Sequence, residues 1–172
     1  MNVFFILIGL FHLLFAFFLS IYGFISTKNW FDKFYIYYNY LVLISWTFFN
    51  GECFITYMIK KYENPKYIAG TDSTDLSDMS YFIDKNIFSF LLILFIILNT
   101  FSIFLVNRRN NYISLYLSIT VLIVHNIYVL FLRKMMNSKL YYQLGLDKIF
   151  EWFQLFTRLF FIYVLILTIS HK

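Results

Sequence analysis

Apolar residues run along this chain in five long blocks that short polar segments separate. The blocks cover Val3–Ile25, Tyr35–Met58, Ile87–Val106, Tyr112–Leu132 and Phe150–Ile169. A helix needs about 20 mainly apolar residues to cross the hydrocarbon core of a bilayer. The blocks lack the strict alternation of barrel strands, which leaves helices as the structure that satisfies backbone hydrogen bonds in lipid. We therefore expect an all-α integral membrane bundle of about five transmembrane helices.

The composition leaves little material for a water-soluble domain. Hydrophobic residues make up 61% of the 172 residues and charged residues 13%, about half the charged share of an ordinary soluble domain. The longest polar connection, Ile59–Asn86, is too short to fold alone. We predict a single membrane-embedded helical domain over residues 1–172, with the first block kept as a helix because it lacks a basic leader and a cleavage site.

The connections predict the relative directions of the helices. Asn107–Asn111 is a short polar run, so the helices on either side of it should be antiparallel neighbours. With five spans, the two termini should lie on opposite sides of the membrane. Apart from Arg158, eight basic residues lie on the side of the N-terminus and five on the other, which favours a cytoplasmic N-terminus.

The net charge of +5 is spread thinly, with no basic run longer than two residues. Such spacing suits anionic lipid headgroups and lacks the basic face of a nucleic-acid binder. The expected partners are therefore the lipid bilayer and other membrane subunits or further copies of this chain, and no nucleic acid.

The first predicted helix carries its small and polar residues on one face, at Gly9, His12, Ala16, Ser20 and Gly23. Spacings of three and four place them in one stripe. Small residues let helices approach closely in a membrane, so the stripe favours a packing seam. His12 could alternatively ligate haem or a metal.

The fourth predicted helix carries Ser118 and His125 on a similar stripe. His12, Ser118 and His125 should therefore face protein rather than lipid. Two intramembrane histidines are the minimum for bis-histidine haem ligation, and their depths are compatible on antiparallel helices. Nothing else in the sequence supports a cofactor, and we predict none.

Polar residues gather where the second predicted helix approaches its basic boundary, at Asn50 and Glu52. Glu52 lies about 12 Å inside that boundary by helical rise, where a lone carboxylate is costly. Gln154 and Arg158 of the fifth helix lie at a similar depth and on one face. We predict that Glu52 and Arg158 touch or share a bridge through Gln154 or Asn50, either as a functional site or as a structural lock between two helices.

Catalytic templates are missing from the sequence: we find no glycine-rich phosphate loop, no metalloprotease histidine pair and no paired carboxylates on one helix. We therefore predict no catalytic residue and no metal site, and we do not expect an enzyme. Cys53, the single cysteine, excludes an intrachain disulfide and is expected to be an inert, reduced thiol.

The first half of the chain resembles a group of small bacterial integral membrane proteins of unknown function. The resemblance rests on His12-Leu13-Leu14-Phe15 with Gly23 and Trp30, on Gly51-Glu52-Cys53-Phe54-Ile55-Thr56, and on Tyr67 before Ala69-Gly70. In that group a proline follows the cysteine and an acid lies a few residues on, where this chain has Phe54 and Met58. The stretch is also similar to Asn-Gly-Cys stretches of uncharacterised multi-pass proteins of large DNA viruses. The resemblance implies a membrane protein and no particular activity.

The residue usage is rich in Phe, Tyr, Ile, Asn and Lys and poor in Ala and Pro, which suggests an AT-rich genome, such as that of a large DNA virus, an organelle, a protist or a low-GC bacterium. The leading expectation for function is a non-enzymatic scaffold or subunit of a membrane assembly. One alternative is a small transporter or channel with an intramembrane polar path. Another is an accessory subunit of an organellar respiratory complex.

Overall fold

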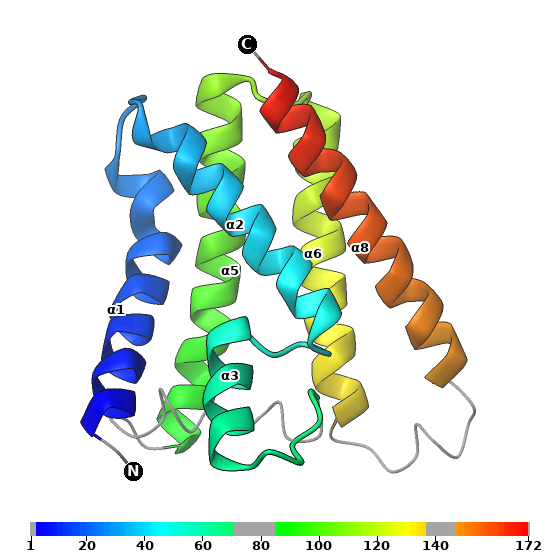
Figure 1. The fold of residues 1–172 in the computed structure, drawn as a ribbon. Coiled ribbons are helices and arrows are strands. Elements are labelled where there is room, and N and C mark those ends of the chain that lie inside the picture. The colour runs from blue at the N-terminus through cyan, green and yellow to red at the C-terminus, as the bar shows by residue number, and fades with distance from the viewer. Residues whose placement is uncertain (1–2, 71–84, 137–146, 172) are drawn as a thin grey trace.

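The computed structural model describes residues 3–70, 85–136 and 147–171, and every regular element in these ranges is an α-helix (Figure 1). The helices are α1 (Val3–Ile25), α2 (Phe31–Phe48), α3 (Phe54–Glu63), α5 (Lys85–Asn110), α6 (Leu115–Met136) and α8 (Asp147–Ser170). The all-α prediction is confirmed for the described residues.

The long helices form two layers, and successive long helices along the chain run in opposite directions (Figure 1). Helices α1, α5 and α6 stand side by side with α5 in the middle, and α2 and α8 cross in front of them at a tilt (Figure 1). The main packing pairs are α1 with α5, α2 with α8 and α5 with α6. The start of α1 and the end of α8 lie at opposite ends of the bundle (Figure 1).

In the part of the chain that the structure describes, three helices are long and apolar enough to cross a membrane: Val3–Ile25, Phe90–Asn110 and Lys148–Ser170. Large apolar side chains cover the outside of these helices, for example Phe11 at 64%, Phe90 at 67% and Leu159 at 58% exposure. Such surfaces are typical of helices that face lipid rather than water.

The second predicted span, Tyr35–Met58, is wrong as a continuous helix. Helix α2 ends at Phe48 because Asn50 and Gly51 both adopt positive φ, at 50° and 88°. The Gly51 amide donates to the Trp46 carbonyl at 2.7 Å. This is the hydrogen bond of a Schellman motif, in which the preceding residue, here Asn50, adopts the left-handed conformation. The Asn-Gly pair is a breaking signal that the apolar run around it concealed.

Residues 50–70 form a separate small unit around α3, and the two ends of this unit meet. The Asn50 side-chain amide donates to the Ala69 carbonyl at 3.0 Å. A Cβ on Gly70 would lie 2.5 Å from the Asn50 Cβ, and Gly70 has a φ of 87°, so only glycine fits this closure.

The connection between α5 and α6 is the tight turn that the polar run predicted. Asn111, at φ 55°, ends α5 in the left-handed conformation that asparagine tolerates. The Ser114 hydroxyl then accepts from the Leu117 amide at 3.3 Å, as an N-cap residue does. Helices α5 and α6 are antiparallel neighbours, as predicted.

Candidate functional site

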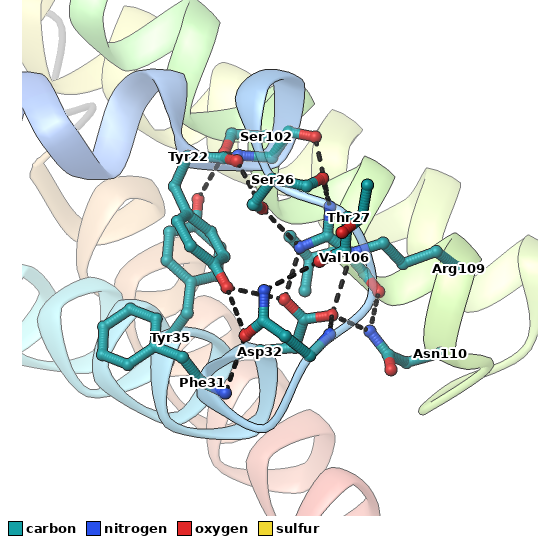
Figure 2. Close-up of polar contacts among 12 residues, drawn as sticks. Tyr22, Ser26, Thr27, Phe31, Asp32, Tyr35, Ser102, Val106, Arg109 and Asn110 are labelled. Carbon is teal, nitrogen blue, oxygen red and sulfur yellow. Dashed lines mark hydrogen bonds and ion pairs between the residues drawn. The ribbon is translucent and has the colours of Figure 1, made fainter.

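The densest cluster of described polar contacts surrounds Asp32, at the bundle end where α2 begins and α5 ends (Figure 2). The Asp32 carboxylate has no exposed surface. It accepts from Arg109 Nε at 2.9 Å, from the Tyr22 hydroxyl at 2.7 Å and from the Asn110 amide at 2.6 Å. A second Arg109 nitrogen, Nη2, also reaches the carboxylate. We call Tyr22, Asp32, Arg109 and Asn110 the aspartate cluster.

Arg109 ties the aspartate cluster to the end of α1. Its Nη2 donates to the Ser26 hydroxyl at 2.7 Å, and its Nη1 donates to the Ser26 carbonyl. The guanidinium carbon lies 5.5 Å from the centre of the Tyr22 ring, within the range of a cation–π contact. One planar, multi-donor group therefore fixes the ends of α1, α2 and α5 together.

The charge state of Asp32 follows from these contacts. Burial alone would raise the pKa of the Asp32 carboxyl, but hydrogen bonds from Arg109, Asn110 and Tyr22 together hold this pKa below its ordinary value. Asp32 lies in the first turn of α2, ahead of the apolar part of that helix, which begins at Tyr35. The carboxylate is therefore ionised at neutral pH and matched by the guanidinium.

A second polar cluster lies at the opposite end of the bundle, inside the 50–70 unit. Glu52 is fully buried, and its Oε1 accepts from Lys60 Nζ at 2.9 Å and from the Tyr67 hydroxyl. Lys60 is itself 7% exposed. The other carboxylate oxygen of Glu52, Oε2, is buried and has no hydrogen-bond partner among the described residues. We call Glu52, Lys60 and Tyr67 the glutamate cluster.

The predicted contact between Glu52 and Arg158 is wrong. Arg158 donates from Nη2 to the Thr47 carbonyl at 2.6 Å, and its guanidinium lies 4.0 Å from the centre of the Phe48 ring. The charge thus caps the last turn of α2, where exposed carbonyls favour a cation. Glu52 finds its cation eight residues along its own chain, because the break after α2 lets Lys60 fold back.

The predicted link between Gln154 and Asn50 exists, although it does not join Glu52 to Arg158. Gln154 Nε2 donates to Asn50 Oδ1 at 3.0 Å, so α8 holds the turn that follows α2. Asn50, Gln154 and Arg158 therefore belong to one contact between α8 and the end of α2.

The two candidate histidines are buried but lie on helices that another helix separates. His12 is 8% exposed and His125 is 1% exposed, and Ser118 is buried too, as predicted. Helix α5 stands between α1, which carries His12, and α6, which carries His125 (Figure 1). The Nδ1 of His125 lies 2.8 Å from the Thr100 hydroxyl of α5. The described residues hold no group of three His, Cys, Asp or Glu side chains that could bind a metal ion.

Sequence reasoning missed the aspartate cluster. Asp32 and Arg109 both lie between predicted spans, where a solvated charge is the ordinary expectation. One signal could have found them: alternating helices place the start of the second helix and the end of the third at the same end of the bundle. Opposite charges at those two positions can then meet.

Further polar side chains link the helices between the two clusters. The Tyr35 hydroxyl of α2 lies 2.6 Å from the Ser102 hydroxyl of α5 and donates to the Leu19 carbonyl of α1 at 2.9 Å. Asn107 of α5 donates to the Tyr40 hydroxyl of α2 at 2.8 Å. These contacts run along the inside of the bundle and leave the outside apolar.

Comparison of this chain with protein-family models, with curated proteins and with solved structures finds no match. The resemblance to uncharacterised membrane proteins therefore stays a prediction. The two clusters and the apolar surface are the features that bear on function.

Proposed function

We propose that this chain is a five-span membrane protein that acts as a non-enzymatic scaffold or as one subunit of a membrane assembly. Three crossing-length apolar helices support the membrane placement. The five long helices alternate in direction (Figure 1), so each could serve as one pass, with α3 beside the membrane boundary.

The use of the buried polar side chains is the observation that carries this proposal. Asp32 with Arg109, Tyr35 with Ser102, and Tyr40 with Asn107 each join two different helices. Gln154 of α8 also holds Asn50, in the turn that follows α2. In a membrane such bonds help to hold helices together, because apolar burial supplies little net drive there. Side chains committed to helix contacts suit a rigid framework better than a path for a solute.

The topology is tested by cysteine labelling in a Cys53→Ser background. Single cysteines would replace the exposed residues Lys28, Asn111 and Asn64, and a membrane-impermeant maleimide would be added to sealed vesicles of known orientation. We expect Lys28→Cys and Asn111→Cys to label from one side and Asn64→Cys from the other. Labelling of all three positions from the same side would refute the five-span arrangement.

The role in an assembly is tested by the size of the particle extracted from the native membrane in a mild detergent. We expect a tagged chain to migrate well above a 20.9-kDa protein in its micelle and to crosslink to defined neighbours. Migration as a monomer, with no crosslinked product, would contradict the proposal.

A transport function is the second candidate, and the glutamate cluster favours it. Broken helices that carry charged groups near the break form substrate and ion sites in many transporters. Here a buried carboxylate with one unpaired oxygen follows the break after α2. Proteoliposomes with a pH-sensitive dye inside would reveal this activity as a proton or cation flux that Glu52→Gln abolishes, whereas the scaffold proposal expects no flux above that of empty vesicles.

A further inference from the structure

A hollow of about 460 Å³ lies beside the aspartate cluster, where the α1–α2 connection, the α5–α6 turn and the end of α8 meet. Its lining includes Lys28, Trp30, Lys33, Tyr112 and His171. The volume falls within the range of small-molecule sites in proteins. The lining comes from three separate regions of the chain, so the hollow is a product of the fold.

The charge presented to this hollow is positive. Lys28 and Lys33 each contribute an ammonium group, and Lys33 Nζ lies 3.2 Å from the His171 carbonyl, which holds the lysine against the end of α8. The nearest carboxylate described, Asp32, has no exposed surface and is already matched by Arg109. The aspartate cluster therefore orders this end of the bundle without neutralising the lysines.

The remaining donors of the lining narrow the ligand class. The side-chain amides of the neighbouring Asn29 and Asn110 already donate to the Thr27 carbonyl and to Asp32. The other polar groups of the lining are the two ammonium groups, the indole of Trp30, which is 86% exposed, the Tyr112 hydroxyl and the His171 ring. Ammonium groups select an oxyanion such as phosphate.

The position of the hollow indicates where the oxyanion would come from. Trp and Tyr side chains concentrate at the level of lipid headgroups, and Trp30 and Tyr112 both line this hollow. The ends of three long helices meet around it (Figure 1). If these helices span the bilayer, the hollow opens at the depth of the headgroup phosphates.

We propose that this hollow binds a phosphate group, carried by the headgroup of an anionic phospholipid. Lys28 and Lys33 contact the phosphate oxygens, and Trp30 lies against the glycerol region. The choice of a lipid as the source rests on the membrane placement proposed above, whereas the binding of phosphate does not.

The test uses the full chain in detergent micelles and follows tryptophan fluorescence during titration with short-chain phosphatidic acid. Short-chain phosphatidylcholine and inorganic phosphate are titrated in parallel. We expect a saturable change with phosphatidic acid, absent in Trp30→Phe, which keeps Trp46 and Trp152. Each basic residue contributes about 1 kcal/mol to such binding, so Lys28→Gln with Lys33→Gln should weaken it by about thirty-fold.

The matched control removes two exposed lysines from the other end of the molecule, by Lys66→Gln with Lys148→Gln, and should leave the titration unchanged. Lys28→Arg with Lys33→Arg keeps both charges and should retain binding. Thermal melts monitored by circular dichroism confirm that each variant is folded. If the double variant does not fold, Lys28→Gln alone, at an exposed position, replaces it in the titration.

Three results would overturn the proposal: equal affinity for phosphatidylcholine, no loss in Lys28→Gln or the double Gln variant, or the same loss in the control pair. Saturation of the same signal by inorganic phosphate would assign the site to a free phosphate and reject the lipid. Because the titration is done in micelles, a failure here is separate from a failure of the five-span topology, which only the vesicle labelling reports.

Discussion

At the scale of single residues, Asp32 and Arg109 are the pair on which one end of the bundle depends. Asp32 has no exposed surface and Arg109 has 18%. A buried ion pair adds little net stability compared with a pair of apolar side chains in the same place. Removal of one partner is costly, however, because the other charge is then buried without a counter-charge. The pair is therefore expected to matter most when it is broken on one side only.

We predict that Asp32→Asn lowers the free energy of unfolding by about 3 kcal/mol, the lower end of the range for a broken buried pair, because Arg109 is partly exposed. Arg109→Gln should cost a similar amount, and the double variant should cost clearly less than the sum. Unfolding in detergent against a graded denaturant measures all three. Additive losses would show that the two side chains are not coupled.

Acid should weaken the same cluster. The folded-state pKa of Asp32 lies below its ordinary value of 3.8, so the unfolded chain binds the extra proton first as the pH falls. The stabilisation by Asp32 is therefore complete above about pH 5 and is lost as the pH falls through 3.8 towards the folded-state pKa. Melting temperatures between neutral pH and pH 3 should show this loss in the wild type and a shallower one in Asp32→Asn.

His125 should hold its proton on Nδ1. The Thr100 hydroxyl has one hydrogen, which it donates to the Ile96 carbonyl at 2.7 Å, so it can only accept from His125 Nδ1 at 2.8 Å. A neutral imidazole then carries its lone pair on Nε2. Nitrogen chemical shifts of labelled histidine should show this tautomer, and Thr100→Val should shift the balance towards the other.

The wrong pairing of Glu52 with Arg158 shows what depth along a helix can and cannot predict. The depth estimate placed both residues at the same end of the bundle, and the contact between Gln154 and Asn50 bears out that neighbourhood. It treated Lys60 as the boundary of the helix that carries Glu52, which excluded Lys60 as a partner. Once Asn50 and Gly51 break the helix, the lysine can turn back to the carboxylate.

At the scale of elements, the seam between α1 and α5 depends on a close approach of two backbones. The predicted small-residue stripe is the buried face of α1, with Gly9, His12, Ser20 and Gly23 all buried. The Gly23 amide donates to the Ser102 hydroxyl at 2.6 Å. The stripe was predictable from the sequence because its spacing alone defines a face. Its partner helix was not, because every long helix is apolar around most of its circumference.

We predict that Gly23→Ala loosens this seam. A Cβ at position 23 would lie 2.4 Å from the Ser102 carbonyl oxygen and 2.7 Å from the Ser102 Cα, and a backbone cannot move aside as a flexible side chain can. Overpacking of this kind costs about 1–3 kcal/mol, which a thermal melt in detergent would register. Phe24→Leu, at the next and exposed position, is the control and should melt like the wild type.

At the scale of the whole molecule, the two polar clusters sit at opposite ends of an apolar bundle. The all-α fold of the described residues followed from the sequence, because the apolar runs are long and lack strand-like alternation. The two-layer arrangement did not follow, because in lipid the packing order depends on small residues and polar contacts rather than on amphipathic faces. The polar contacts that set it join residues far apart in the chain, as Asp32 and Arg109 are.

Because α2 ends early, at Phe48, this chain should fit a thin bilayer better than a thick one. Eighteen residues make a helix about 27 Å long, and α2 is tilted within the bundle (Figure 1), whereas a typical hydrocarbon core is about 30 Å thick. If α2 crosses the membrane, as proposed above, its apolar part is no longer than this and must thin the surrounding lipid, which has a cost for each ångström of mismatch. Melting in vesicles of graded acyl-chain length should therefore show the highest stability in the thinner membranes. A cell that holds membranes of different thickness would retain this protein in the thinnest of them.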